Sequence, residues 1–282
     1  MQIARVPGPA VRGVVLGYRG FRLPPIATRR RLIVPDTTAK VMIGLAEPVR
    51  VLPAVGDGTA MAAASLVNPL RATASVGEHT GRIEGITVLF DPLSAYRVFG
   101  PVLGELGQVP TALDDLLPGA AELVERLAGH PPARAGWAAR FRLLDDAFAA
   151  RLGRYAVAPE VAAAWSLLRA RAGRVATRDL AAETGWSVRR LQRRFAAHIG
   201  LAPRAAAAVF RLQRSLRLHA DGASWTRAAA EAGFYDQPQF NRAFRAMVGR
   251  SPRQFEAQRR RSDPGDAADF VPGQVTSTLL SH

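Results

Sequence analysis

The chain has 282 residues, no cysteine and a formal net charge of +15. This length suits one large or two ordinary domains, and a hydrophobic content of 48% is enough for a buried core. The lack of cysteine excludes disulfides, cysteine-ligated zinc and thiol catalysis. No stretch has the order of a signal peptide or the length of a membrane span, so we expect a soluble, cytoplasmic protein without membrane contacts.

The first part of the chain, to about residue 108, is predicted to be rich in β-strands. Short apolar runs such as 13–18 and 86–90 alternate with turn signals such as Gly56-Asp57-Gly58. Strands at this spacing are typical of a sandwich or barrel. Because ligands often bind in the mouth of a barrel, a small-molecule effector pocket is a hypothesis for this domain, although no motif names the ligand. The run Arg29-Arg30-Arg31 either binds an anion or faces solvent.

Helices are predicted next, over about 111–128 and 134–153, within a domain that we assign to residues 1–155. Thr111-x-x-Asp114 has the form of a capping box, and Gly129-His130-Pro131-Pro132 separates the two helices. Leucine and phenylalanine residues recur in them at helical spacing. Such stripes are core or dimer surfaces far more often than cofactor sites.

A short linker leads into a region, residues 159–261, that is predicted to be entirely helical. The fold class is therefore α+β. Residues 158–261 carry a net charge of +13, whereas residues 1–157 carry +5. A field concentrated in this way is what a polyanion-binding domain requires. The tail, 262–282, is rich in Asp, Pro, Gly and Ser and carries a net charge of −3, and we predict that it is disordered.

The basic region contains an internal repeat. Ala181-Ala182-Glu183-Thr184-Gly185 recurs 48 residues later as Ala229-Ala230-Glu231-Ala232-Gly233. Leu191 and Phe195 recur 49 residues later as Phe240 and Phe244. Two copies of one pattern predict two structural units of the same kind.

Each copy has the features of a helix-turn-helix unit. Gly185 and Gly233 supply the positive φ of a tight turn, and Ser187 and Asp236 are N-cap candidates for the second helix of each unit. After the second unit, Ser251-Pro252-x-Gln254 begins one more helix. A continuous helix is predicted from Pro203 to about His219. It spans roughly 25 Å, so the two units can reach successive major grooves about 34 Å apart.

The outward face of each second helix carries Arg, Gln and Asn side chains. Their hydrogen-bonding edges match those of guanine and adenine in the major groove. The candidate DNA-binding residues are Arg189, Arg190, Gln192, Arg193 and Arg194 in the first unit, and Gln237, Gln239, Asn241, Arg242 and Arg245 in the second.

At these residues the sequence resembles the AraC/XylS family of bacterial transcription regulators, over about residues 160–260. The resemblance is carried by Leu180-Ala181, Ser187, Leu191, Arg193, Phe195, Gly200, Arg211-Leu212, Ala229, Gly233-Phe234, Phe240, Arg242-Ala243-Phe244, Gly249 and Ser251-Pro252. Two positions depart from the family pattern. Tyr235 stands where a small capping residue is usual, and Pro238 lies in the first turn of the second recognition helix.

The resemblance implies that double-stranded promoter DNA is the partner. It implies base or phosphate contacts from Arg189, Gln192 and Arg193 in the first unit, and from Gln237, Gln239 and Arg242 in the second. It also implies that the N-terminal domain binds an effector or forms a homodimer, and that an activator contacts RNA polymerase. Activator and repressor are not distinguished by the sequence.

No catalytic, cofactor or metal motif is found. The five histidines do not have metal-ligand spacing, and His198 is predicted to be a packed helix-end residue. Asp114-Asp115 and Asp145-Asp146 are adjacent pairs, which diverge on a helix and are predicted to face solvent. We therefore predict a regulator and not an enzyme. Two alternatives stay open: non-specific binding of nucleic acid through the basic patch, and an enzymatic N-terminal domain that the C-terminal domain localises.

Overall fold

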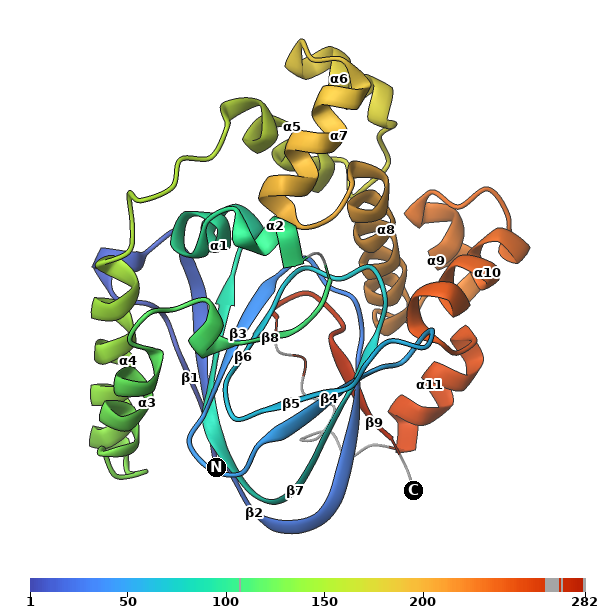
Figure 1. The fold of residues 1–282 in the computed structure, drawn as a ribbon. Helices are drawn as coiled ribbons and strands as arrows, with labels where there is room; N and C mark the ends of the chain where they lie inside the picture. Colours follow the sequence, from blue (N-terminus) through green and yellow to red (C-terminus); the bar gives the residue numbers. More distant parts are fainter. Residues whose placement is uncertain (107, 262–268, 270, 281–282) are drawn as a thin grey trace.

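The computed structural model describes residues 1–106, 108–261, 269 and 271–280. A sheet-rich N-terminal part is followed by a helical C-terminal part (Figure 1), which confirms the predicted α+β fold class. Among these residues no helix combines the length and the apolar character needed to cross a bilayer.

Two long antiparallel strands, β2 (Val15–Ile33) and β7 (Ser75–Phe90), organise the sheet. Their pairing is irregular between Leu23 and Arg29, and such irregularities bend paired strands. The bend divides the sheet into two half-sheets. The other strands are β1 (Gln2–Arg5), β3 (Ala39–Gly44), β4 (Val49–Pro53), β5 (Met61–Ala63), β6 (Leu66–Asn68), β8 (Thr111–Ala112) and β9 (Ser277–Leu280).

The first half-sheet combines 15–23 of β2 and 83–90 of β7 with β1, β3, β6 and β8. The second half-sheet combines 29–33 of β2 and 75–79 of β7 with β4, β5 and β9. Because side chains alternate between the faces of a strand, each half-sheet has an outer and an inner face. The inner faces of both half-sheets contribute to one cavity.

The outer face of the first half-sheet packs on helices of the N-terminal domain. Val41, Ile86 and Val88 join Trp137 and Phe141 in one buried cluster. The helices are α1 (Pro92–Phe99), α2 (Val102–Leu106), α3 (Ala120–Ala128) and α4 (Arg134–Ala149). The apolar stripe predicted for this region is therefore core.

Two expectations for this region are wrong. A helix does not begin at Thr111, because Thr111–Ala112 forms β8 on β6 and the amide of Leu113 donates to the Ser65 carbonyl at 3.1 Å. Asp145 does not face solvent. It is buried, and its carboxylate accepts hydrogen bonds from the Tyr18 hydroxyl at 2.8 Å and the Gly8 amide at 3.1 Å. Both differences arise from partners that are distant in sequence.

The outer face of the second half-sheet packs on the C-terminal helices. Leu32, Val34 and Val76 share a buried cluster with Phe210 and Met247. The helices are α5 (Pro159–Ala170), α6 (Thr177–Thr184), α7 (Val188–Ile199), α8 (Pro203–Ala220), α9 (Trp225–Ala232), α10 (Gln237–Val248) and α11 (Pro252–Arg261). The bent sheet thus has α3 and α4 on one side and α8 to α11 on the other (Figure 1), whereas α7 contacts α1 and α2 directly.

The prediction of a disordered tail is wrong for its described end. Strand β9 adds to the edge of β2, and Thr276, Ser277 and Thr278 are fully buried. The Arg259 guanidinium of α11 donates to the carbonyl of Ser277 at 2.9 Å and pairs with Asp269 at 3.1 Å. Pairing with the edge of β2 therefore orders residues 277–280, although the composition of the tail predicted disorder. Residues 262–268, 270, 281 and 282 of the predicted tail lie outside the described residues.

Candidate nucleic-acid interface

Helices α6 and α7 form the first helix-turn-helix unit, and α9 and α10 form the second. The turns are built alike: φ is +66° at Gly185 and +88° at Gly233. The amide after each glycine donates to the carbonyl five residues earlier, at 3.1 Å in both units. This is a helix C-terminal motif that a left-handed glycine permits. The predicted turns are confirmed.

The N-caps of both recognition helices are also confirmed. The Ser187 hydroxyl accepts from the amide of Arg190 at 3.3 Å, and the Asp236 carboxylate accepts from the amide of Gln239 at 2.6 Å. Tyr235 is one of the two departures from the family pattern. Tyr235 precedes the cap, and its side chain is 92% exposed.

The predicted apolar pairs orient the recognition helices. Leu191 and Phe195 of α7 are buried, and Phe195 lies 6.2 Å from the ring of Trp165. Phe240 and Phe244 of α10 are buried in the equivalent way against Trp225. With these faces inward, the opposite face of each helix is turned away from the core.

Nine of the ten candidate DNA-binding side chains are exposed. The exception is Gln237, which is half-buried and whose amide nitrogen donates to Asn241 at 3.3 Å. Two more take part in local contacts: the Gln239 side chain accepts from the amide of Tyr235, and Arg190 lies over the ring of Trp186. The exposed nine are Arg189, Arg190, Gln192, Arg193, Arg194, Gln239, Asn241, Arg242 and Arg245. Their contacts with DNA stay a prediction.

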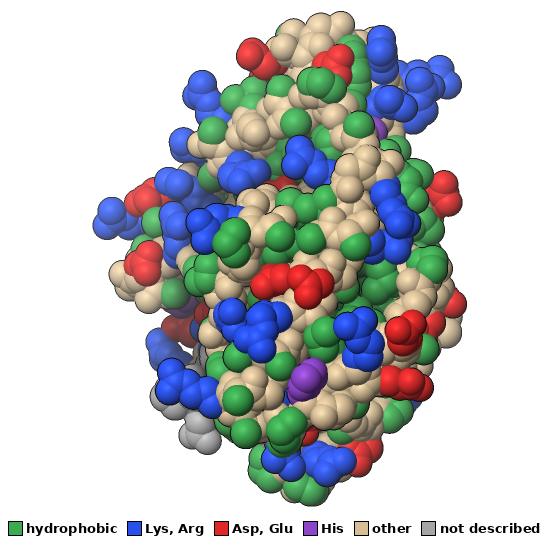
Figure 2. Space-filling model, turned by 90° about the vertical axis from the view of Figure 1, so that its left-hand side faces the viewer, with side chains coloured by type: hydrophobic (Ala, Val, Ile, Leu, Met, Phe, Trp, Pro, Cys, Tyr) green, Lys and Arg blue, Asp and Glu red, His purple; other side chains and the backbone are tan. Residues whose placement is uncertain are grey.

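The recognition helices carry cations without acids. Helix α7 has four arginines and α10 has two, and neither has an Asp or a Glu. By contrast, α3 and α4 together contain four basic and four acidic residues, and the face of the molecule that they form shows both signs intermixed (Figure 2). The recognition helices therefore present an uncompensated positive field to a polyanion, unlike α3 and α4.

The first unit docks on α1 and α2. The ring of His198, at the end of α7, stacks on Tyr96 of α1 at 4.2 Å. Its Nδ1 donates to the Arg194 carbonyl at 2.8 Å and its Nε2 accepts from the Ala158 amide at 3.4 Å. Burial lowers the pKa of His198 below its usual value, although the Arg194 carbonyl opposes this. The prediction of a packed helix-end histidine is confirmed.

The second unit docks on the second half-sheet. The carbonyl of Met247, at the end of α10, accepts from the amide of Ala74 at 2.7 Å. In α8, the buried Gln213 amide donates to the carbonyls of Pro35 at 2.6 Å and Val275 at 2.9 Å. These contacts join the helical region to the sheet. They could not be predicted, because a single glutamine in a sequence carries no signal of what it contacts.

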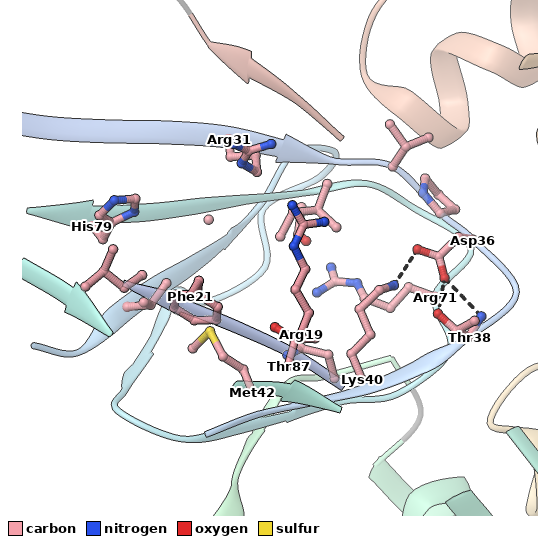
Figure 3. Close-up of a pocket in the computed structure, with 18 of the residues that line it drawn as sticks. Arg19, Phe21, Arg31, Asp36, Thr38, Lys40, Met42, Arg71, His79 and Thr87 are labelled. Atoms are coloured by element: carbon pink, nitrogen blue, oxygen red, sulfur yellow. Dashed lines mark hydrogen bonds and ion pairs between the residues drawn. The ribbon is translucent and has the colours of Figure 1, made fainter. Parts of the chain in front are cut away.

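Between the half-sheets lies the cavity, which has a volume of about 190 Å³ and is partly open to solvent. Arg29 and Arg31 line it, whereas Arg30 pairs with Glu78 at 3.3 Å on the other face. Figure 3 shows Arg19, Arg71 and Lys40 projecting into the same space, with His79 toward its other end. Arg71 and His79 were not among the candidate residues predicted from the sequence. Within the described part of the chain, no group of three or more His, Cys, Asp or Glu residues could hold a metal ion.

Residues 180–258 match a family model described as a helix-turn-helix domain. The C-terminal part of the chain is an AraC-type helix-turn-helix domain, which confirms the resemblance predicted from the sequence. No curated protein sequence gives a significant match.

Among solved structures, the chain is similar to ToxT from Vibrio cholerae, with 10% identity over 84% of this chain and 96% of that chain, and a TM-score of 0.44. A ToxT structure with bound unsaturated fatty acid has 11% identity over 84% and 93%, and a TM-score of 0.45. The AraC-like transcriptional activator CuxR has 14% identity over 79% and 88%, and a TM-score of 0.29. Such scores do not define the N-terminal domain, whose interpretation depends on its own residues.

Proposed function

We propose that this protein is a sequence-specific, DNA-binding transcription regulator whose activity responds to a small-molecule effector in the N-terminal cavity. One observation carries the proposal: two repeated units expose recognition helices with arginine and amide side chains and no acidic residue. Arginine binds guanine through two parallel hydrogen bonds, and Asn or Gln binds adenine in the same way. Helix α8, with 18 residues, separates the units by about 27 Å of helix axis.

The effector part of the proposal is supported by the position of the cavity. It lies between the half-sheets, and the second half-sheet is the surface on which the second unit docks. A ligand in the cavity would thus contact the support of a DNA-binding unit. The homodimer, the RNA polymerase contact and the cytoplasmic location stay predictions.

Non-specific binding of nucleic acid is the second candidate, and the net charge of +13 on residues 158–261 favours it. Selection from a random duplex library, using the full chain at two salt concentrations, separates the two. Sequence-specific recognition predicts a consensus with two half-sites at both salt concentrations. Enrichment of no sequence, together with a steep fall in affinity with salt, would leave only the non-specific function.

A further inference from the structure

The lining of the cavity holds a strong excess of positive charge. Among the described residues that line it, Asp36 is the single carboxylate. This group is already engaged: it accepts from the amide of Thr38 at 2.9 Å and from the Thr38 hydroxyl at 2.6 Å, and it pairs with Lys40. The cationic lining residues are Arg19, Arg29, Arg31, Lys40 and Arg71. Cations held at the rim of a low-dielectric space attract an anion more strongly than the same cations in water.

Arg71 is the group that most needs a partner. Its Nε is buried and has no hydrogen-bond acceptor among the described residues, and no described carboxylate pairs with it. Desolvation lowers the pKa of Arg71, so burial opposes its charge. A half-buried guanidinium whose Nε has no acceptor among the described residues is costly, and an anion in the cavity would supply both the opposite charge and the acceptor.

A second unpartnered polar atom faces the other end of the cavity. Nε2 of His79 is buried and has no hydrogen-bond partner in the described part of the chain. Burial, and then the charges of Arg29 and Arg31, lower the pKa of His79, so the neutral imidazole is favoured. Its Nε2 is therefore free to donate or accept one hydrogen bond from a neutral polar group. Arg31, at this end, already donates to the Ser277 hydroxyl at 2.9 Å, whereas Nε of Arg71 has no acceptor among the described residues, so we place the anionic end of a ligand at Arg71.

Apolar side chains occupy the space between these two ends. Phe21 and Met42 lie between His79 and Arg71 in Figure 3. The apolar lining residues are Phe21, Leu23, Ile33, Val34, Met42, Val49 and Ile83. A small inorganic anion would leave this surface wet, whereas an apolar body would cover it.

One wall of the cavity is also the surface on which the second unit docks. Along residues 69–77 the odd positions line the cavity, among them Arg71 and Thr73. The even positions Leu70, Ala74 and Val76 belong to the buried cluster that contains Met247 of α10. Ala74, whose amide donates to the Met247 carbonyl, directly follows Thr73 in the chain and is three residues from Arg71. A shift of Arg71 toward a ligand would therefore move the residues that hold α10.

We propose that the cavity binds an organic anion with an apolar body, that Arg71 binds its anionic group, and that residues 69–77 transmit occupancy to the second helix-turn-helix unit. The regulatory part of this inference rests on the proposed function, whereas the ligand-binding part does not.

Ligand binding is tested by calorimetric titration of the full chain with decanoate and 1-naphthoate. Decanol and 1-naphthylmethanol supply the apolar bodies without charge, and acetate supplies the charge without the body. We expect at least one of the two larger carboxylates to bind more tightly than its uncharged counterpart and than acetate. Binding by neither carboxylate, or equal binding by the alcohols, would overturn the proposal.

The role of Arg71 is tested with Arg71→Met, which keeps the length of the side chain and removes its charge. We expect a loss of carboxylate affinity of about tenfold or more, as for a charge-assisted hydrogen bond. Arg82→Met is the matched control, because Arg82 is exposed on β7 and does not line the cavity. Thermal unfolding of both variants verifies that they are folded. A folded Arg71→Met that binds the carboxylate as tightly as the parent contradicts the assignment.

Transmission is tested by hydrogen exchange of the full chain with and without the bound carboxylate. We expect exchange to change in residues 69–77 and in α10 more than in α7, because α7 docks on α1 and α2. A change confined to the sheet, or equal in both recognition helices, would overturn the coupling. This experiment uses no DNA, so it gives its result whether or not the library selection yields a consensus.

Discussion

The two helix-turn-helix units are alike within themselves and differ in what supports them. Their turns and caps match position by position, and in their cores Leu191 and Phe195 correspond to Phe240 and Phe244. The first unit, however, stacks His198 on Tyr96 of α1, whereas the second bonds Met247 to Ala74 of the cavity wall. Met247 occupies the position that His198 holds in the first unit, 49 residues earlier. Local sequence thus determines the structure of each unit. The surface on which a unit docks determines whether a ligand in the cavity can affect that unit.

The largest effect is expected from the aromatic cores. Phe195→Ala and Phe244→Ala, at equivalent positions of the two units, each remove a fully buried ring and should each lower the free energy of unfolding by about 3–5 kcal/mol. Denaturant unfolding of the full chain measures this. Tyr235→Ala, at an exposed ring, is the control and should change little. If either phenylalanine variant were as stable as the control, the two units would not be packed alike.

The next largest effect is expected in DNA binding. Arg193→Ala and Arg242→Ala should each weaken binding of a selected site by about 1–3 kcal/mol and relax base preference in one half-site. Arg126→Ala removes an exposed charge from α3, away from both units, and serves as the control. A gel-shift titration with the selected and a scrambled duplex measures both quantities. Equal losses in all three variants would indicate a general charge effect instead of two specific contacts.

Smaller effects are expected at the caps. Ser187→Ala and Asp236→Ala should each lower the free energy of unfolding by about 0.5–2 kcal/mol, because each leaves an amide of the first helical turn without its acceptor. Their thermal midpoints, compared at the same pH, test this. A neutral effect at Ser187 with a large effect at Asp236 would show that the two recognition helices do not begin in the same way.

The smallest effect is a pH dependence confined to the first unit. Burial depresses the pKa of His198 in the folded chain, so the unfolded chain takes up its proton first as the pH falls. Stability is therefore retained above the unfolded pKa of about 6.5 and lost as the pH falls below it toward the depressed value. His198→Met, which installs the residue of the second unit, should lose less stability between pH 7.5 and 5 than the parent. Identical pH profiles for the two proteins would remove this difference between the units.

Local signals in the sequence were sufficient for the helical region. Gly185, Gly233, Ser187 and Asp236 act on neighbours within five residues, so spacing alone predicted their roles. The errors arose where the partner is distant. Thr111 pairs with β6 instead of starting a helix.

The candidate functional residues of the cavity could not be predicted from the spacing of residues in the sequence. Arg71 and His79 become noticeable only when two half-sheets enclose a space in which Nε of Arg71 and Nε2 of His79 have no hydrogen-bond partner among the residues that the structure describes. Arg29 and Arg31 could be separated from Arg30 only once the strand faces were known. The alternation of residues along a strand predicts which side chains share a face. The bend in β2 and β7 determines that the inner faces of the two half-sheets lie opposite each other around the cavity.

The most direct test of two specific DNA-binding units is hydroxyl-radical footprinting of the full chain on its selected site. Two protected blocks on one side of the duplex are expected, with centres about 10 base pairs apart. Arg193→Ala should weaken one block and Arg242→Ala the other. A single continuous footprint that both variants weaken evenly, or protection that is equal on a scrambled duplex, would contradict recognition by two separate helices.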